Sequence, residues 1–248
     1  MKRFVLFISI FLNVLLSAQA VTKAEADSAY VAGDYQRAVT LYDSLLQAGV
    51  SYELYYNLGN AYYRMDDITH AVLNYERASQ LAPGDADVRF NLQMARSKTI
   101  DKIVPESEMF FVTWYHSLVN LTGVDGWGYL ALVMLGLALL LALLYLFANG
   151  ILLRKLGFFG SIVAVLLFFV SNLLAWQQKN EYLKNRGAII MESAVTVKST
   201  PANNGTDLFI LHEGTRVNVI DDSMRDWKEI RVADGKQGWI ETKQIETI

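Results

Sequence analysis

Side chains that could carry out catalysis or bind a metal are few in this chain of 248 residues. It has no cysteine, which excludes disulfides, thiolate nucleophiles and cysteine-based zinc sites. The three histidines, His70, His116 and His212, are far apart, and none has a neighbour at a metal-binding spacing such as HExxH. We therefore predict a protein that is not an enzyme and that uses no metal and no cofactor. These absences argue most directly against a cell-wall hydrolase built on a Cys–His pair or on histidine-bound zinc.

The charge of the chain narrows the classes of partner. The formal net charge is -3, and no cluster of Lys and Arg could neutralise a run of phosphates. We therefore expect no binding to nucleic acid.

The residues best placed to bind a partner belong to an internal repeat. A unit of about 34 residues carries a tetratricopeptide (TPR) spacing: Tyr55-x2-Leu58-Gly59-x2-Tyr62, Ala71-x3-Tyr75, Ala78 and Pro83. In this repeat, small residues let two antiparallel helices approach closely, and tyrosines fill the space between the helices. A more degenerate copy lies at Gly33–Leu45, and Asn91-Leu92 repeats Asn57-Leu58 one unit later. We predict a TPR domain over residues 21–98, with two repeats and a closing helix.

The first helices of such repeats line a concave groove that suits extended or helical peptides. In this register the groove residues are Glu53, Tyr56, Asn57, Asn60, Arg64 and Asn91. Resemblance to peptide-binding TPR domains implies that Asn57 and Asn60 hold a peptide backbone or a terminal carboxylate. The basic partners of a carboxylate clamp are missing, since Asp87 stands where a lysine would be. A solvated face with no partner is the alternative.

From Ala188 onward, apolar and polar residues alternate in short runs separated by turn residues. We predict a small closed barrel over residues 188–248, with about five strands: 194–197, 208–211, 216–220, 227–232 and 238–240. The order of these signals resembles the bacterial SH3-like (SH3b) domain, whose members bind cell-wall peptides or protein segments. That resemblance makes Trp227 and Trp239 candidate binding residues. Packing of both tryptophans in the core or at its rim is the alternative.

Three apolar stretches predict how the chain meets a membrane. Residues 1–20 have the charged start, apolar stretch and Ala18-Gln19-Ala20 site of a signal peptide. An uncleaved anchor is the alternative. The uncharged runs 127–149 and 156–176 are each long enough to cross a bilayer once. We expect two transmembrane helices.

The segments between these runs set the expected orientation. Residues 99–126 would form a linker and an aromatic segment in the membrane interface, or an extension of the first span. Residues 150–155 would form a cytoplasmic turn, where Arg154 and Lys155 agree with the positive-inside rule, and residues 177–187 a second linker. Basic residues after the second span weaken this agreement: Lys179, Lys184 and Arg186. We expect a multi-pass protein of the bacterial inner membrane with both soluble domains on the periplasmic side.

Taken in order, these parts make the whole chain similar to the BatE-type proteins of the bacterial aerotolerance operon. The resemblance covers all 248 residues and depends on the architecture and on the Tyr55–Pro83 motif. It implies an envelope complex with membrane-anchored von Willebrand factor A-domain proteins and a MoxR-type ATPase, linked to aerotolerance or stress resistance. We expect a multidomain α plus β protein that serves as a scaffold for protein or peptide partners. A peptidoglycan sensor that uses the SH3-like domain is the alternative.

Overall fold

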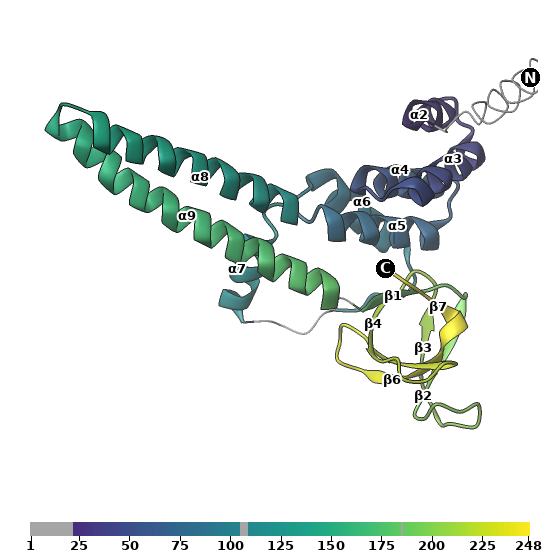
Figure 1. Ribbon diagram of the computed structural model, residues 1–248. Coiled ribbons are helices and arrows are strands. Elements are labelled where there is room, and N and C mark those ends of the chain that lie inside the picture. The colour runs from purple at the N-terminus through teal and green to yellow at the C-terminus, as the bar shows by residue number, and fades with distance from the viewer. Residues whose placement is uncertain (1–21, 105–108, 185) are drawn as a thin grey trace, which may run out of the picture.

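The computed structural model describes residues 22–104, 109–184 and 186–248. The expected signal peptide at residues 1–20 lies outside the described residues, as does the middle of the expected linker at residues 105–108. Figure 1 shows a layer of helices, a long helical hairpin that points away from it, and a curled sheet against the helical layer. The fold is therefore a mixed α plus β structure with two long apolar helices, as the sequence predicts.

Within residues 22–104, the N-terminal layer contains five helices: α2 (Lys23–Val31), α3 (Tyr35–Ala48), α4 (Tyr52–Arg64), α5 (Ile68–Leu81) and α6 (Ala86–Lys98). Each begins after a polar residue whose side-chain oxygen accepts a backbone N–H of the first turn: Thr22, Asp34, Ser51, Asp67 and Asp85. Consecutive helices pack against each other. Local capping signals thus fix where each helix begins.

The packing of α4 on α5 depends on the absence of a side chain at Gly59. A Cβ atom at this position would lie 2.8 Å from ring carbons of Tyr75, which is itself only 1% exposed. Ala71 and Ala78 are also fully buried. The small and large residues of the repeat motif therefore meet between the helices, as their spacing predicts.

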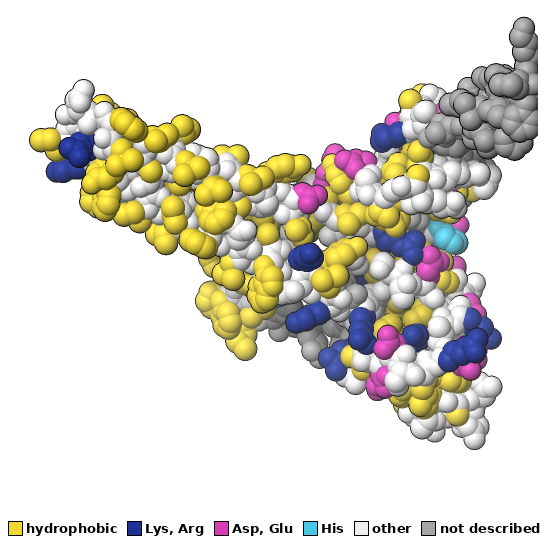
Figure 2. Space-filling model, in the orientation of Figure 1, with side chains coloured by type: hydrophobic (Ala, Val, Ile, Leu, Met, Phe, Trp, Pro, Cys, Tyr) yellow, Lys and Arg dark blue, Asp and Glu magenta, His cyan; other side chains and the backbone are white. Residues whose placement is uncertain are grey.

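The hairpin contains α8 (Val124–Phe147) and α9 (Ile151–Lys184), preceded by the short α7 (Phe110–Val119). Both long helices are apolar enough to cross a membrane, and most of their apolar length is exposed (Figure 2). They approach closely at Gly157, where a Cβ atom would lie 2.6 Å from the backbone nitrogen of Tyr145.

The helices of the hairpin extend beyond the expected spans. Helix α8 begins at Val124, and α9 includes most of the expected turn and of the second linker. The turn itself is short, between Phe147 and Ile151. Residues 151–155 and 177–184 contain neither Gly nor Pro, so nothing in the sequence ends the helix there.

The C-terminal sheet has seven strands: β1 (Gly187–Ile190), β2 (Ala194–Lys198), β3 (Asp207–His212), β4 (Arg216–Asp221), β5 (Trp227–Arg231), β6 (Gln237–Glu241) and β7 (Ile245–Thr247). A 3-10 turn (Thr242–Gln244) precedes β7. All neighbours are antiparallel, in the order β3-β2-β6-β5-β4-β1-β7. The five expected strands are present, and β1 and β7 are additional. A buried cluster from six of the strands and nearby loops forms the core.

The contact between Gly59 and Tyr75 predicts a large effect of side-chain bulk. We expect Gly59→Val to lower the free energy of unfolding by about 2 kcal/mol, because the buried ring of Tyr75 must shift. Gly49→Val is the matched control, since nothing lies within 4 Å of a Cβ atom there. Thermal unfolding of the full chain in detergent, followed by circular dichroism, measures both variants. Equal melting temperatures for the two variants would contradict the close packing.

Candidate partner-binding site

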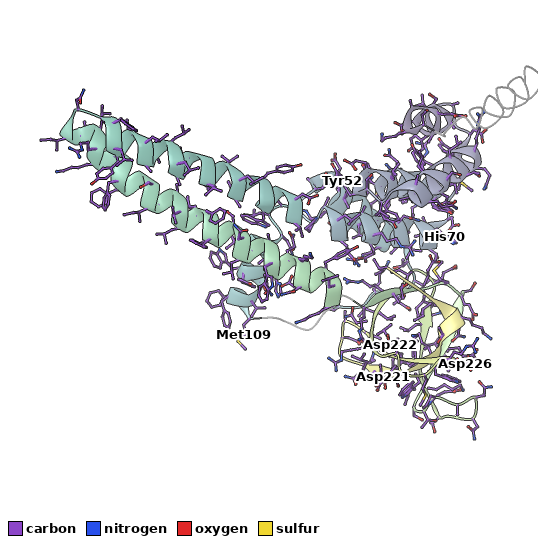
Figure 3. All side chains as sticks on the ribbon, viewed as in Figure 1. Tyr52, His70, Met109, Asp221, Asp222 and Asp226 are labelled. Atoms are coloured by element: carbon purple, nitrogen blue, oxygen red, sulfur yellow. The ribbon has the colours of Figure 1, made fainter. Side chains whose placement is uncertain are left out.

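The residues predicted to line the groove lie on α4 and α6. Glu53 and Arg64 are exposed near the two ends of α4, and the other four are half-buried between them or on α6. Figure 3 shows Tyr52 at the start of α4 and His70 at the start of α5, at opposite ends of the helical layer. The face therefore runs along α4 and continues onto α6.

Asn60 and Asn91 hold neighbouring helices together. The side-chain oxygen of Asn60 accepts hydrogen bonds from the Tyr75 hydroxyl at 2.7 Å and from Asn91 Nδ2 at 2.9 Å. Asn91 Nδ2 also donates to the hydroxyl of Tyr56 at 3.0 Å. The structure thus brings three of the predicted residues into one network that joins α4, α5 and α6.

Asn57 makes the corresponding link to α2. Its Nδ2 donates to Asp27 Oδ1 at 3.3 Å, and the Tyr42 hydroxyl donates to the same oxygen at 2.6 Å. Burial alone would raise the pKa of Asp27, but hydrogen bonds from Lys23 and Tyr42 outweigh it and lower the pKa below its ordinary value. Asp27 therefore places a fixed negative charge beside Asn57.

The end of the groove at α2 is aromatic. The guanidinium of Arg64 lies 5.2 Å from the ring centroid of Tyr35, and Tyr35 packs edge-on against Tyr30 at 5.4 Å. Sequence reasoning missed Asp27, Tyr30 and Tyr35, although all three lie within or beside the degenerate first copy of the repeat. With the shift of 33 residues that relates Ala38 to Ala71, Asp27 corresponds to the predicted groove residue Asn60. Tyr30 and Tyr35 correspond to Tyr63 and Ile68, which the repeat register does not assign to the groove.

Part of the hydrogen-bonding capacity of the three asparagines remains free. Within residues 22–104, 109–184 and 186–248, no side chain donates a hydrogen bond to the side-chain oxygen of Asn57 or of Asn91. The side-chain nitrogen of Asn60 likewise donates to no side chain there. These atoms could pair with both the N–H and the C=O groups of an extended peptide. The arrangement therefore suits recognition of a peptide main chain.

The two tryptophans of the sheet lie on its outer face. Side chains alternate along a strand, and the neighbours Ile230 and Ile240 are fully buried in the core, which points Trp227 and Trp239 the other way. Trp239 pairs with Glu229, two residues from Trp227, so the two tryptophans share one face. Both are half-buried, and neither belongs to the core cluster.

A second polar cluster joins the linker to the sheet. Asp101 Oδ2 accepts hydrogen bonds from the backbone N–H of His212 at 2.7 Å and from the Thr215 hydroxyl at 2.7 Å. Asp101 Oδ1 lies 2.8 Å from His212 Nδ1. Burial would raise the pKa of Asp101, but these hydrogen bonds together lower it. The linker is thereby fixed on the C-terminal sheet.

This cluster lacks the geometry of a hydrolytic triad. A nucleophilic hydroxyl would have to lie on the ring nitrogen of His212 that faces away from Asp101, whereas the Thr215 hydroxyl donates to the carboxylate itself. Among the described residues, no group of three or more His, Asp or Glu side chains could hold a metal ion.

The helical layer and the C-terminal sheet also make polar contacts. Arg77 donates to Glu246 at 2.9 Å and to the carbonyl of Thr247 at 2.7 Å, and Thr69 donates to Glu213 at 3.3 Å. No hydrogen bond or ion pair among the described residues links the C-terminal sheet or the hairpin to α2 or α4. The sheet therefore makes these polar contacts with α5 rather than with α2 or α4.

The Asn60 network predicts a coupled loss of stability. We expect Asn60→Ala to lower the free energy of unfolding by about 1–3 kcal/mol, because the buried Tyr75 hydroxyl loses its acceptor. In a Tyr75→Phe background, the decrease in the free energy of unfolding caused by Asn60→Ala should be about 1 kcal/mol smaller. Chemical denaturation of all four proteins completes the double-mutant cycle. Strictly additive effects would show that the hydrogen bond carries no stability.

The Asp101 cluster predicts a dependence on pH. Because its pKa is lowered from 3.8, the stabilisation is present near neutral pH and is lost as the pH falls below about 4. Asp101→Ala should lower the free energy of unfolding by about 1–3 kcal/mol at pH 7. The melting temperatures of wild type and variant should converge in acid, because the interaction is then lost in both. Asp226→Ala, at an exposed position, should leave the melting temperature unchanged. A constant difference in melting temperature from pH 7 to pH 3 would contradict this role.

Comparisons with known proteins leave the family open, since no family model matches this chain and no curated protein is similar to it.

Proposed function

We propose that this chain is a membrane-anchored scaffold of the BatE type, with a TPR domain and an SH3-like barrel. The proposal rests on the Tyr55–Pro83 motif, on the five packed helices that contain it, and on the small antiparallel sheet that follows the hairpin. It includes no catalytic step. The SH3-like assignment rests on the order of strands and turns.

The hairpin supports membrane anchoring. Its two helices expose a continuous apolar surface of a size that soluble proteins rarely leave in water. The observation that carries the proposal is that the helical layer and the barrel lie together at one end of this hairpin (Figure 1). With both spans in a bilayer, the two soluble parts face one compartment, which we propose is the periplasmic side of a bacterial inner membrane.

The groove on α2, α4 and α6 is the proposed binding surface for protein or peptide partners. It remains uncovered because the barrel docks on α5. The expected partners in such a complex are von Willebrand factor A-domain membrane proteins. Anchoring on the same membrane would raise the effective concentration of a bound partner near its neighbours.

Photocrosslinking tests this proposal in intact cells. We expect a photoreactive amino acid at Glu53 or Arg64 to capture a defined protein, whereas the same group at Thr40, exposed on α3 outside the groove, should not. Mass spectrometry identifies the adducts. Equal capture at Thr40 and at the groove positions would contradict a groove-bound partner.

A second candidate function, binding of peptidoglycan by the barrel, draws on the outward-facing pair Trp227 and Trp239. Cosedimentation of the purified full chain with peptidoglycan sacculi separates the two functions. Sedimentation that Trp239→Ala abolishes would favour the cell-wall sensor over the scaffold.

A further inference from the structure

The tip of the hairpin carries a cavity of about 340 Å³ in which two cationic side chains meet aromatic rings. Its volume falls within the range of small-molecule sites in proteins. Helices α8 and α9 both contribute to its wall: Tyr145, Ile151, Arg154, Lys155, Phe158 and Phe159. Figure 2 shows the Lys and Arg side chains together at this tip, next to apolar surface and far from the soluble parts.

Neither cation has a carboxylate partner. The sequence contains no Asp or Glu between Asp125 and Glu181. At a helical rise of 1.5 Å per residue, those two carboxylates lie about 30 Å along α8 from Tyr145 and about 39 Å along α9 from Lys155. Among the described residues, no ion pair includes Arg154 or Lys155, and both side chains are exposed. Any compensating negative charge therefore comes from outside the described residues.

The guanidinium of Arg154 is held in the cavity wall by an aromatic ring. It lies 5.6 Å from the ring centroid of Tyr145, within the range of a cation–π interaction. The same ring packs against Phe158, with the two centroids 5.5 Å apart. The backbone of Tyr145 is close to α9, because a Cβ atom at Gly157 would lie 2.6 Å from its nitrogen. Packing between the two helices thus orients one cation before any ligand binds.

The cavity lies at the depth of lipid phosphates if the hairpin crosses a bilayer. Trp176 marks the other end of the apolar run of α9. The helical rise places Arg154 and Lys155 about 32 to 33 Å from it. Because the hydrocarbon core of a bilayer is about 30 Å thick, the two cations reach the headgroup layer opposite the soluble parts.

An apolar face of α9 leads away from the cavity. Phe159, Val163 and Leu166 follow Lys155 at spacings that place all four residues on one side of the helix. The three apolar side chains are 62%, 55% and 60% exposed. They would contact the acyl chain of a lipid whose phosphate lies beside Lys155, whereas a soluble anion or an acidic peptide has no such chain for this face.

We infer that this cavity binds the phosphate of an anionic phospholipid, such as phosphatidylglycerol. Arg154 would donate hydrogen bonds to the phosphate, and Lys155 would add a second positive charge. A zwitterionic lipid fits less well, because its ammonium would lie beside two cations with no carboxylate near it. The inference rests on the proposed crossing of the membrane by the hairpin, and it adds a lipid site in the leaflet opposite the two soluble parts.

Native mass spectrometry of the full chain tests the inference. The purified protein in maltoside detergent is mixed with equal amounts of phosphatidylglycerol and phosphatidylethanolamine of identical acyl chains. We expect preferential retention of one phosphatidylglycerol. Arg154→Gln and Lys155→Gln should each lower that retention about tenfold, because each removes a charged donor. Lys179→Gln, the same change at an exposed position near the other end of α9, should have no effect.

Variants of Tyr145 test how Arg154 is positioned. Tyr145→Phe keeps the ring beside the guanidinium and should retain the lipid as wild type does, whereas Tyr145→Leu should lower retention about threefold. The melting temperatures of the lipid-free Arg154→Gln and Lys155→Gln variants should match wild type, because both cations are exposed. Equal retention of both lipids by wild type, or undiminished retention by these two variants, would overturn the site. Equal retention by Tyr145→Phe and Tyr145→Leu would overturn the positioning role of the ring.

Two further arms separate the lipid site from its alternatives. Glycerophosphoglycerol, the soluble headgroup ester, should displace the lipid only weakly, and displacement at equimolar amounts would overturn the membrane source. Compartment reporters fused after Ser97 and Ile248 test the crossing independently. Reporters on opposite sides would overturn the proposed anchoring even where lipid retention is intact. Reporters on one side, together with equal retention of both lipids, would overturn the lipid site alone.

Discussion

The carboxylate of Glu76 lies where the helical layer meets the C-terminal sheet, and its side chain is only 5% exposed. A charge removed from water is tolerated when opposite charges and hydrogen bonds replace the water. Arg96 supplies one such contact from the neighbouring helix α6, and Arg216 of β4 approaches the other carboxylate oxygen at 3.8 Å. Ile189 of β1 is fully buried in the apolar cluster of the same helices. The set of contacts around Glu76 is therefore complete only when the sheet is docked on the helices, and the two soluble parts form one body.

That docking also fixes both ends of the hairpin. The chain leaves α6 at Lys98 and runs along the sheet, where Asp101 accepts three hydrogen bonds and Ile103 packs against the sheet core. It returns from α9 directly into β1, next to α5. The hairpin is thus an insertion between two docked segments, and hydrogen bonds at its base, such as that from Gln178 to Thr122, order it further. Helices α5, α7 and α9 and strand β4 line a cavity at this base, because the helical layer, the hairpin and the sheet are held against one another.

The sequence predicts those parts of the fold that depend on local signals. The spacing of Gly59 and Tyr75 and the alternation along β2 to β6 each reflect contacts within one repeat or one strand, so they are readable without the rest of the chain. Strand β1 was not predicted because all four of its residues are buried, which removes the alternation that marks a half-exposed strand. The bond between Asp101 and His212 spans 111 residues, and neither residue type is unusual at its position. No local pattern encodes such a pair.

The candidate groove on α4 and α6 was predicted because the repeat register fixes it, whereas the contribution of α2 was hidden by the degenerate first copy.

The hydrogen bonds inside the groove bear on which partner it can accept. Folding already orders the asparagines of the network, so a partner would not have to immobilise them on binding. Their free atoms include both acceptors and a donor, which matches the alternating groups of a peptide main chain better than a terminal carboxylate. Asp27 adds to this bias, because its lowered pKa keeps a negative charge at the α2 end of the groove. A chain terminus bound there would bring a second negative charge beside it. On α6, Asp87 stands where a carboxylate clamp would need a lysine. The physical chemistry of this face therefore favours an internal segment of a partner, bound through its backbone, over a free C-terminus.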